Sequence, residues 1–423
     1  MTTFNTISVI GLGYIGLPTA TAFASCGKKV LGVDVNQHAV DTINQGKIHI
    51  VEPDLDVAVK SAVEQGLLTA SLVPHAADAF LIAVPTPFKA EHEPDLSYVE
   101  AAAKAIAPVL QKGNLVVLES TSPVGATEAV EQWLRQERPD LTFPSQAGEK
   151  ADIKLAYCPE RVLPGKIMQE LFSNDRVIGG LSSACAKAAA ELYRLFVKGD
   201  CIETNARTAE MCKLTENSFR DVNIAFANEL SLVCDHLGIS VWELIRLANR
   251  HPRVNILQPG AGVGGHCIAV DPWFIVAQAP EQARLIRTAR EVNDYKPHWV
   301  IEQVKKALAD VVSQRDCKAS DVRIACLGLA FKPDIDDLRE SPAVEITHDL
   351  ANWHKGQVVA VEPNIEQLPK ILQQQNIELV SLDDARRDAD ILVLLVDHSQ
   401  FKAVQGCDIT QQWVIDTRGI WRE

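Results

Sequence analysis

Positive charge is scarce in this chain of 423 residues, which has 41 Lys and Arg against 55 Asp and Glu and a formal net charge of −14. Nucleic acids and anionic membrane surfaces bind clusters of cations, so this balance argues against either as the main partner. A small anionic substrate is still compatible with it, because a few placed Arg and Lys residues can override the global sign locally.

Long apolar runs are also missing. No stretch approaches the roughly 20 residues that a membrane helix needs, and Met1–Ile10 has no basic stretch followed by an apolar segment. The ten Cys are scattered, without a C-x-x-C pair or a Cys/His spacing typical of zinc, so no metal site is expected. Such cysteines are typical of reduced thiols in the cytosol. We therefore expect a soluble cytoplasmic protein.

The length predicts two or three domains. The first ~200 residues alternate short β-rich runs with helical stretches, which is typical of a parallel sheet covered on both faces. The strands expected there are Ile7–Ile10, Lys29–Val33, Ala79–Val84 and Leu115–Leu118, and the helices include Ala101–Leu110 and Thr127–Gln136.

A helical region follows. From Thr204 to Leu237 there is no Pro and no Gly, and apolar residues recur at helical spacing before a plausible stop at Gly238. Such a helix, ~30 residues long, exceeds a usual α/β layer and indicates a spine between domains or a dimer interface. Further helices are expected at Val241–Asn249 and around Glu281–Val312.

Strand-like runs return in the last third of the chain, which predicts a second, smaller α/β domain. They are Arg323–Leu327, Gln357–Val361, Ile391–Val396 and Trp413–Asp416.

The first expected strand runs directly into the glycine-rich turn Gly11-Leu12-Gly13-Tyr14-Ile15-Gly16, which opens an apolar helix. Glycines at this spacing permit a tight turn, a close backbone approach to a pyrophosphate and close helix–strand packing. Asp34 ends the next strand, 18 residues beyond Gly16. There a carboxylate would accept from ribose hydroxyls and repel a 2′-phosphate, so NAD is expected rather than NADP.

Three threonines lie where a cofactor would be contacted. Thr86 and Thr121 follow strands, and ligands bind at such carboxyl ends in open α/β sheets. Thr127 starts an expected helix and could cap it or touch the cofactor. For each of the three, a turn or cap role remains an alternative.

The most unusual cysteine is Cys267, which ends the run Gly260-Ala261-Gly262-Val263-Gly264-Gly265-His266-Cys267. Four glycines in six residues let backbone approach a ligand closely and could leave N–H groups free to stabilise an anion. Asp271 follows four residues later, within one helical turn if the segment coils. From the residues alone, a small buried cysteine without chemistry stays an alternative.

Polar groups on the long helix form a second constellation. Lys213, Asn217 and Arg220 are spaced i, i+4 and i+7, so an ammonium, an amide and a guanidinium share one face. A solvated polar stripe would show the same spacing.

Two loops add further candidates. Cys158–Gly165 offers the carboxylate of Glu160 and the guanidinium of Arg161. Gly328–Pro333 follows a strand of the last domain and carries Lys332, which could also be an ordinary surface lysine.

In this order, the segments resemble the UDP-glucose/GDP-mannose dehydrogenase family over essentially the whole chain. The match combines a Rossmann start, a Pro-Glu-Arg loop, a Lys-x-x-x-Asn helix, a Gly-Gly-x-Cys loop and a Gly-Leu-Ala-Phe-Lys strand end. It implies an α/β fold of two Rossmann-like α/β domains joined by a helical central domain with a long spine helix. The implied domains are an NAD-binding domain at 1–200, a helical dimerisation domain with the cysteine loop at 201–312, and a UDP-sugar-binding domain at 313–423.

The resemblance also implies an enzyme that oxidises the C6 alcohol of a nucleotide sugar to a carboxylate, using two NAD per sugar. The Cys267 thiolate would attack the C6 aldehyde, and the thiohemiacetal would become a thioester that water hydrolyses. Lys213 and Asn217 would stabilise oxyanions. Asp271 could orient water or Lys213, and Glu160 could act as general acid/base.

The same resemblance assigns binding residues. The nucleotide-sugar site would be lined, together with Lys213 and Asn217, by Arg161, Val162, Arg220, Gly264, Phe331, Lys332 and Arg418. His251 and Arg253 would come from the neighbouring subunit of a homodimer. The cofactor would be bound by Gly11, Gly13, Tyr14, Ile15, Gly16, Asp34, Thr86, Thr121, Thr127 and Arg339.

Two positions differ from the usual pattern of the UDP-glucose branch and bear on the identity of the sugar. The UDP-glucose branch usually has a lysine just before the aspartate equivalent to Asp271, where this chain has Val270, and commonly has a second carboxylate where this chain has Pro164. Both favour the acetamido-sugar branch and UDP-N-acetyl-D-mannosamine, whose uronate would supply a bacterial surface polysaccharide of the enterobacterial common antigen type. UDP-glucose and UDP-N-acetylglucosamine stay alternatives.

Two other function classes remain open. A two-electron 3-hydroxyacid dehydrogenase shares the Rossmann-plus-helical layout but needs neither the cysteine nor a third α/β domain. A non-catalytic nucleotide-sensing or scaffolding protein would bind NAD without turnover. Two NADH per substrate would indicate the nucleotide-sugar oxidation, and one would indicate the hydroxyacid oxidation.

Overall fold

The structure, a computed structural model, describes residues 4–50, 52–89, 92–163, 165–265, 267–404 and 412–421. Pro164 and His266, which the sequence analysis mentions, lie outside the described residues. The chain divides into two compact units, Met1–Glu216 (unit 1) and Asn217–Glu423 (unit 2).

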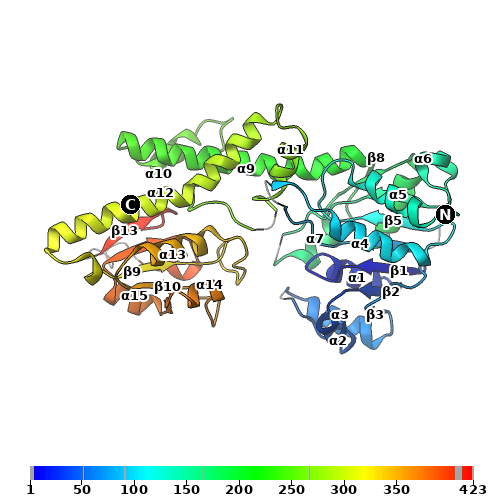
Figure 1. The fold of residues 1–423 in the computed structure, drawn as a ribbon, viewed down its shortest axis with the longest axis horizontal. Helices are drawn as coiled ribbons and strands as arrows, with labels where there is room; N and C mark the ends of the chain where they lie inside the picture. Colours follow the sequence, from blue (N-terminus) through cyan, green and yellow to red (C-terminus); the bar gives the residue numbers. More distant parts are fainter. Residues whose placement is uncertain are drawn as a thin grey trace. The chain divides into compact units, whose positions relative to one another are not determined.

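Unit 1 is built on an eight-stranded sheet with the order β3-β2-β1-β4-β5-β6-β7-β8 (Figure 1). Its strands are β1 (Thr6–Ile10), β2 (Lys29–Val33), β3 (Leu68–Ser71), β4 (Ala79–Ile82), β5 (Leu115–Leu118), β6 (Lys154–Tyr157), β7 (Arg176–Gly180) and β8 (Cys201–Asn205). All four strands expected in this region are present. β4 and β5 are buried throughout, which explains their continuous apolar runs.

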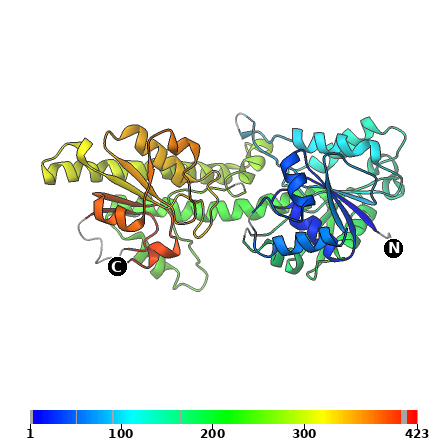
Figure 2. The same ribbon diagram turned by 90° about the horizontal axis from the view of Figure 1, so that it is seen from below.

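Helices cover both faces of this sheet (Figure 2). They are α1 (Gly16–Ser25), α2 (Gln37–Asn44), α3 (Leu55–Glu64), α4 (Ser97–Ile106), α5 (Ala126–Glu137), α6 (Pro144–Ala147), α7 (Ile167–Ser173) and α8 (Ser183–Tyr193). Alternate residues of β4 enter different cores. Ala79 and Leu81 pack with α1, α3 and α8, whereas Phe80 and Ile82 pack with α4 and α5.

The sheet is not parallel throughout, which corrects the expectation from strand–helix alternation. β6 pairs antiparallel with β7, with Ala156 opposite Gly180, and β7 then pairs parallel with β8. The link from β6 to β7 carries the Pro-Glu-Arg loop and only the short α7. The chain therefore re-enters the sheet in the opposite direction, without the long crossover that parallel neighbours require.

The long helix expected from the sequence is α9 (Ala206–Leu237), which has 32 residues. It ends at the predicted residue but begins two residues later than predicted, because Thr204 and Asn205 belong to β8. Its first turns belong to unit 1, and the part from Asn217 onward belongs to unit 2.

In unit 2, three more helices follow, namely α10 (Val241–Ala248), α11 (Asp271–Gln278) and α12 (Arg284–Arg315). They form the helical central region. The later part of α12 packs on the second sheet, because its Val300, Val304 and Val311 share a buried apolar cluster with Ile324 and Cys326.

The second sheet has five parallel strands in the order β11-β10-β9-β12-β13. They are β9 (Ile324–Leu327), β10 (Val358–Val361), β11 (Glu378–Leu379), β12 (Ile391–Leu394) and β13 (Trp413–Asp416), with α13 (Pro342–Trp353), α14 (Lys370–Gln373), α15 (Leu382–Asp388) and α16 (Ser399–Lys402). This order repeats β3-β2-β1-β4-β5 of unit 1, so both sheets are Rossmann-like. The predicted fold class is confirmed.

Candidate active site

The three glycines of the turn after β1 have different surroundings. Gly11 has a φ of 91°, which favours glycine, and a Cβ there would lie 2.5 Å from the carbonyl oxygen of Ala83. A Cβ on Gly16 would lie 1.8 Å from the carbonyl oxygen of Gly11, so α1 can pack on the turn only with glycine. Around Gly13, no atom of the described residues lies within 4 Å of a Cβ. The turn therefore leaves space at Gly13 for the backbone to approach a dinucleotide.

Asp34 lies against this turn. Its Oδ2 accepts the N–H of Leu12 at 2.8 Å, and its Oδ1 accepts the N–H of Asn36 at 2.9 Å. The carboxylate and the glycine turn thus form one site at the carboxyl ends of β1 and β2. Tyr14 and Ile15 are half-buried in the same turn.

The structure brings two of the three predicted threonines together. Thr86 donates its hydroxyl to the carbonyl of Thr121 at 2.6 Å, so the loops after β4 and β5 meet. Thr127 instead donates its hydroxyl and its N–H to Glu210 of α9, at 2.7 and 2.8 Å, and Glu210 also accepts the N–H of Gly125. The cap role considered for Thr127 is therefore wrong, because the Glu210 carboxylate caps α5.

Glu160 of the Pro-Glu-Arg loop is held in one orientation. It is 7% exposed, its Oε2 accepts Nη1 of Arg176 at 2.5 Å, and its Oε1 accepts the N–H of Arg161 at 2.8 Å. Arg176, which the sequence analysis missed, is itself only 2% exposed. A pair so deeply buried fixes both side chains, since separating them would leave an uncompensated charge.

Three other residues of the same loop differ in their surroundings. Arg161 donates to Glu216 and to the carbonyl of Asp175, both at 2.8 Å. Val162 packs against the apolar core of unit 1. Cys158 is fully buried, and burial raises the pKa of its thiol to about 12, so it stays protonated near neutral pH.

The polar face of α9 is largely shielded from water. Lys213 is 9% exposed and Asn217 is 6% exposed, whereas Arg220 is exposed. A solvated stripe would leave all three in water, so this alternative is wrong for Lys213 and Asn217. Buried polar side chains need partners, and Asn217 donates its amide to Oδ2 of Asp271 at 2.5 Å.

Cys267 is exposed and lies one turn before α11. Its carbonyl accepts the N–H groups of Val270 and Asp271, at 3.1 and 2.9 Å. Asp271, the first residue of α11, is 2% exposed and bonded to Asn217. Cys267 is therefore bonded through its backbone to the N-terminal end of α11, the positive end of that helix.

The glycines before Cys267 are required by contacts within unit 2. A Cβ on Gly262 would lie 2.8 Å from Pro342, one on Gly264 would lie 2.4 Å from the carbonyl of Glu340, and one on Gly265 would lie 3.0 Å from the ring of Phe331. The sequence pattern indicated that these glycines let the backbone approach a ligand. The structure adds a second cause, close packing on the protein itself, and this packing places Phe331 beside the cysteine segment.

Of the remaining predicted residues of unit 2, Arg418 and Arg339 have hydrogen-bond partners within the unit, whereas Lys332, His251 and Arg253 differ in their exposure. Arg418 donates Nε to Asp397 at 2.8 Å and reaches the carbonyl of Pro259 at 3.5 Å, so it lies at the start of the cysteine segment. The guanidinium of Arg339 makes two hydrogen bonds to Asp337, at 2.8 and 2.6 Å. Lys332 is half-buried, and His251 and Arg253 are exposed in the loop after α10.

Comparison with known proteins gives the chain its family. Profiles of the UDP-glucose/GDP-mannose dehydrogenase family match in three parts, the NAD binding domain at residues 5–197, the central domain at 207–295 and the UDP binding domain at 325–423. The UDP-N-acetyl-D-mannosamine dehydrogenase of Escherichia coli (strain K12) is 69% identical over 419 residues, 99% of this chain and 100% of the relative. The chain belongs to this family. It is an NAD-dependent oxidoreductase.

Two further members extend the comparison. The NDP-N-acetyl-D-galactosaminuronic acid dehydrogenase of Ralstonia nicotianae (strain ATCC BAA-1114 / GMI1000) is 64% identical over 418 residues, 99% of this chain and 96% of the relative. The solved structure of the UDP-D-ManNAc dehydrogenase from Pyrococcus horikoshii has a TM-score of 0.87 at 40% identity, covering 99% of this chain and 96% of that one. The fold is thus that of the family's solved structures.

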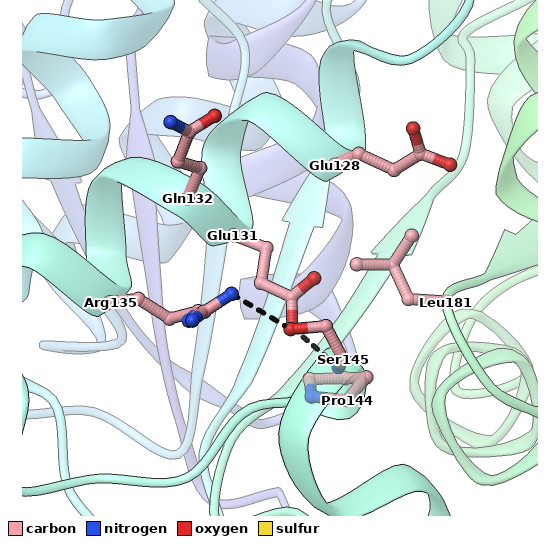
Figure 3. A pocket seen from close by; sticks show the side chains of 7 residues that line it. All are labelled: Glu128, Glu131, Gln132, Arg135, Pro144, Ser145 and Leu181. Atoms are coloured by element: carbon pink, nitrogen blue, oxygen red, sulfur yellow. Dashed lines mark hydrogen bonds between the residues drawn. The ribbon is translucent and has the colours of Figure 1, made fainter.

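A hollow of about 400 Å³ between α5 and α6 contains none of the residues that the sequence singled out (Figure 3). Three of the polar residues that line it already bind one another. Ser145 donates its N–H to Glu131 at 2.7 Å and accepts from Arg135 at 3.1 Å, which ties α6 to α5. We assign this hollow a structural role.

The described residues give no sign of a metal site or of a membrane-spanning helix. They contain no group of three or more His, Cys, Asp or Glu side chains arranged to hold a metal ion. None of the helices in the described ranges is both long enough and apolar enough to cross a membrane.

Proposed function

We propose that this dehydrogenase oxidises the C6 alcohol of UDP-N-acetyl-D-mannosamine to the carboxylate, with Cys267 as the covalent nucleophile. One observation supports the chemistry above all. The exposed Cys267 thiol lies one turn before a buried aspartate, Asp271, whose carboxylate is held by Asn217 of α9. The sugar is inferred from the relative in Escherichia coli, which is 69% identical over its full length.

The cofactor would be held at the turn after β1. Gly11, Gly13 and Gly16 offer the tight turn, the open approach and the helix packing that a pyrophosphate needs, and Asp34, which lies against this turn, would read the adenosine ribose. Thr86 and Thr121, joined at the carboxyl ends of β4 and β5, add contacts, and Arg339 is assigned to the cofactor by resemblance. Two NAD, bound in succession, would each accept a hydride from C6.

Cys267 makes the second oxidation possible. Its thiolate adds to the aldehyde carbonyl and forms a thiohemiacetal, whose oxidation gives a thioester. Water then cleaves the carbon–sulfur bond, which releases the carboxylate and returns the thiol. Covalent capture keeps the aldehyde from leaving between the two oxidations.

Lys213 and Asn217 would stabilise the negative oxygen that develops on C6. Both are largely buried, and a charge or a dipole acts more strongly where water is excluded. Asp271 would orient water or Lys213. Glu160, held by Arg176, would take a proton from the water that attacks the thioester.

The residues that would bind the sugar nucleotide are assigned by the family resemblance. We assign this role to Arg161, Val162, Arg220, Gly264, Phe331, Lys332 and Arg418, with His251 and Arg253 contributed by a neighbouring subunit. The contacts of Phe331 with Gly265 and of Arg418 with Pro259 support it, because both residues lie along the segment that leads to Cys267.

The central test replaces Cys267 by Ser. A hydroxyl is a far weaker nucleophile than a thiolate, so Cys267→Ser should abolish carboxylate formation while it still binds NAD and the sugar nucleotide. Cys26→Ser is the matched control, because Cys26 is also exposed but lies in unit 1. Wild type should release two NADH per sugar. Normal carboxylate production by Cys267→Ser, or one NADH per substrate, would refute the mechanism.

A second sugar is a specific candidate, because a relative at 64% identity carries the name of an NDP-N-acetyl-D-galactosaminuronic acid dehydrogenase. NADH release from UDP-N-acetylmannosamine, UDP-N-acetylgalactosamine, UDP-N-acetylglucosamine and UDP-glucose separates the possibilities. Turnover of UDP-N-acetylmannosamine alone would settle the sugar, and a higher kcat/KM for any other member of the panel would replace it.

A homodimer is part of the proposal. Four apolar side chains, Phe219, Phe226, Val233 and Leu237, are 46% to 68% exposed on α9. The first three are spaced by seven residues, so they share one side of the helix. An exposed apolar stripe of this kind marks an interaction surface, and we assign it to a second copy of the chain.

The biological role follows from the product. We propose that the uronate enters a bacterial surface polysaccharide of the enterobacterial common antigen type, as the family resemblance implies. Deleting the gene should remove uronate-containing polymer from the cell surface, and complementation with Cys267→Ser should fail to restore it.

A further inference from the structure

Asn228 of α9 is fully buried and bonded to the start of the cysteine segment. Its Oδ1 accepts the N–H of Gly260 at 2.9 Å, and its Nδ2 donates to Oδ1 of Asn293 on α12 at 2.8 Å. α9 and α12 lie side by side here (Figure 1). Gly260 begins the glycine-rich run that ends at Cys267.

The other end of the same segment is bonded to the same helix. Asn217 donates its amide to Asp271, four residues after Cys267. Asn217 and Asn228 are 11 residues apart, about three helical turns, so their side chains leave α9 from the same face. Gly260 and Asp271 are also 11 residues apart. Two amides of one helix thus hold the two ends of the segment that carries the thiol.

The orientation of the Asn228 amide is fixed by a buried hydrogen-bond network on α9 and α12. Asn293 donates Nδ2 to Oδ1 of Asp221 at 2.8 Å, and Arg290 donates Nη1 to the same oxygen at 2.6 Å. Asn293 therefore presents its oxygen to Asn228, and Asn228 must present its own oxygen to Gly260. Asp221, Arg290 and Asn293 are all at most 1% exposed, so water does not compete for these bonds.

We propose that Asn228 is a positioning residue for Cys267, and that with Asn217 it sets the place of the thiol relative to α9. The proposal rests on the proposed function, since it assumes that Cys267 is the nucleophile. Asn228 acts through the backbone at Gly260 and touches no reacting atom. Its loss should therefore lower kcat more than it changes KM, because a misplaced nucleophile slows the covalent step while the ligand contacts remain.

The matched control is Asn114 of unit 1, which is also buried and, like Asn228, accepts one hydrogen bond and donates another through its amide, although both of its partners are backbone groups. It accepts the N–H of Gln111 at 2.7 Å and donates to the carbonyl of Ala77 at 2.9 Å. It lies just before β5, at the amino end of the strand, opposite the carboxyl ends where Thr86 and Thr121 meet. Asn228→Ala and Asn114→Ala lose comparable bonds and should lower Tm alike.

The experiment compares kcat, both KM values and the alkylation of Cys267 by iodoacetamide, with exposed Cys26 as internal reference in peptide mapping. For Asn228→Ala we expect kcat to fall by roughly ten- to a hundredfold, since small misplacements of catalytic groups have effects of this size. Both KM values should stay within about threefold, and the ratio of Cys267 to Cys26 alkylation, measured from pH 6 to 9, should change. Asn114→Ala should leave kcat and this ratio unaltered.

Two further variants keep the proposal testable if Asn228→Ala does not fold. Asn228→Asp keeps the acceptor for Gly260 but loses the amide donor to Asn293, and it should retain more of kcat than Asn228→Ala. Asn293→Ala leaves that bond but removes its support, and should lower kcat at least threefold relative to Asn114→Ala. The proposal is overturned if these variants match the control in kcat and in alkylation. If Cys267→Ser is inactive in the same assays, that failure leaves the proposed function intact.

Discussion

Glu119 is fully buried just after β5, and burial raises the pKa of its carboxyl to about 8. Its Oε1 accepts the hydroxyl of Tyr193 at 2.5 Å. An unfolded Glu titrates near 4.5, so the folded state binds more protons between pH 4.5 and 8. The stability that Glu119 contributes is complete below this window and is lost as pH rises through about 8.

Glu119→Gln tests this assignment, because Gln keeps an oxygen for Tyr193 and cannot titrate. We expect the Tm of wild type to fall more steeply than the Tm of Glu119→Gln between pH 6 and 9, by a few degrees over the range. Thermal denaturation followed by circular dichroism measures both curves. Parallel curves would show that Glu119 titrates as it does in the unfolded chain.

Asp34 has two possible duties, reading the ribose and supporting the glycine turn through Leu12. Asp34→Asn separates them, because the amide oxygen can still accept the N–H of Leu12, while the negative charge and the second acceptor, which binds the N–H of Asn36, are lost. We expect the ratio of kcat/KM for NAD over NADP to fall roughly tenfold, the size of a lost hydrogen bond to a charged group. An equal loss with both cofactors would mean that Asp34 only supports the turn.

In the turn after β1, Gly13 and Gly16 differ in the space that an added side chain would find. A methyl group at Gly13 meets nothing in the described structure, whereas at Gly16 it would overlap the carbonyl of Gly11. Gly13→Ala should therefore keep the Tm of wild type and weaken NAD binding by about tenfold or more, because the methyl occupies the space of the pyrophosphate. Gly16→Ala should lower Tm.

Calorimetric titration with NAD and thermal denaturation together check this pair. The outcome that contradicts the assignment is a Gly13→Ala protein with normal NAD affinity. It would mean that the open space beside Gly13 is not where the cofactor approaches.

Secondary structure was predictable where the sequence pattern is strong. β2, β5 and β13 have the limits that their apolar runs predicted, and α9 ends at the predicted residue, before Gly238. Four strands of unit 1 were missed for local reasons, among them β6, which has only three apolar residues, Leu155–Tyr157. β3 is only partly buried, β7 ends in two glycines, and β8 does not alternate apolar with polar residues. None of these three strands has the sequence pattern of a buried strand.

The site was predictable only in part, for a related reason. Cys267, Asp271 and Asn217 are marked by residue type and by spacing, and the structure brings Asn217 to Asp271. Arg176, Glu210 and Asn228 were missed. Their partners lie 16, 83 to 85 and 32 residues away, and no local pattern reports a contact that only the folded chain makes. The spacing of Asn228 from Asn217 was the one available hint.

We expect two copies of the chain to form a dimer in which the exposed apolar side chains of α9 lie in the interface. Phe226→Glu puts a carboxylate into the middle of this surface, where burial would cost several kcal/mol unless the charge is paired. We expect this variant to be monomeric in size-exclusion chromatography with light scattering, while wild type is dimeric. Ile371→Glu is the control, since Ile371 is 48% exposed on α14. A dimer that survives Phe226→Glu would move the interface elsewhere.

The uninterrupted course of α9 constrains how this chain can evolve. Each residue of a helix turns the next by about 100°, so one residue inserted between Asn217 and Asn228 would send the two amides in different directions. The number of residues between Asn217 and Asn228 is thus fixed by helix geometry. Homologues should differ there by substitutions alone, and insertions or deletions in this helix should occur only before Asn217 or beyond Asn228.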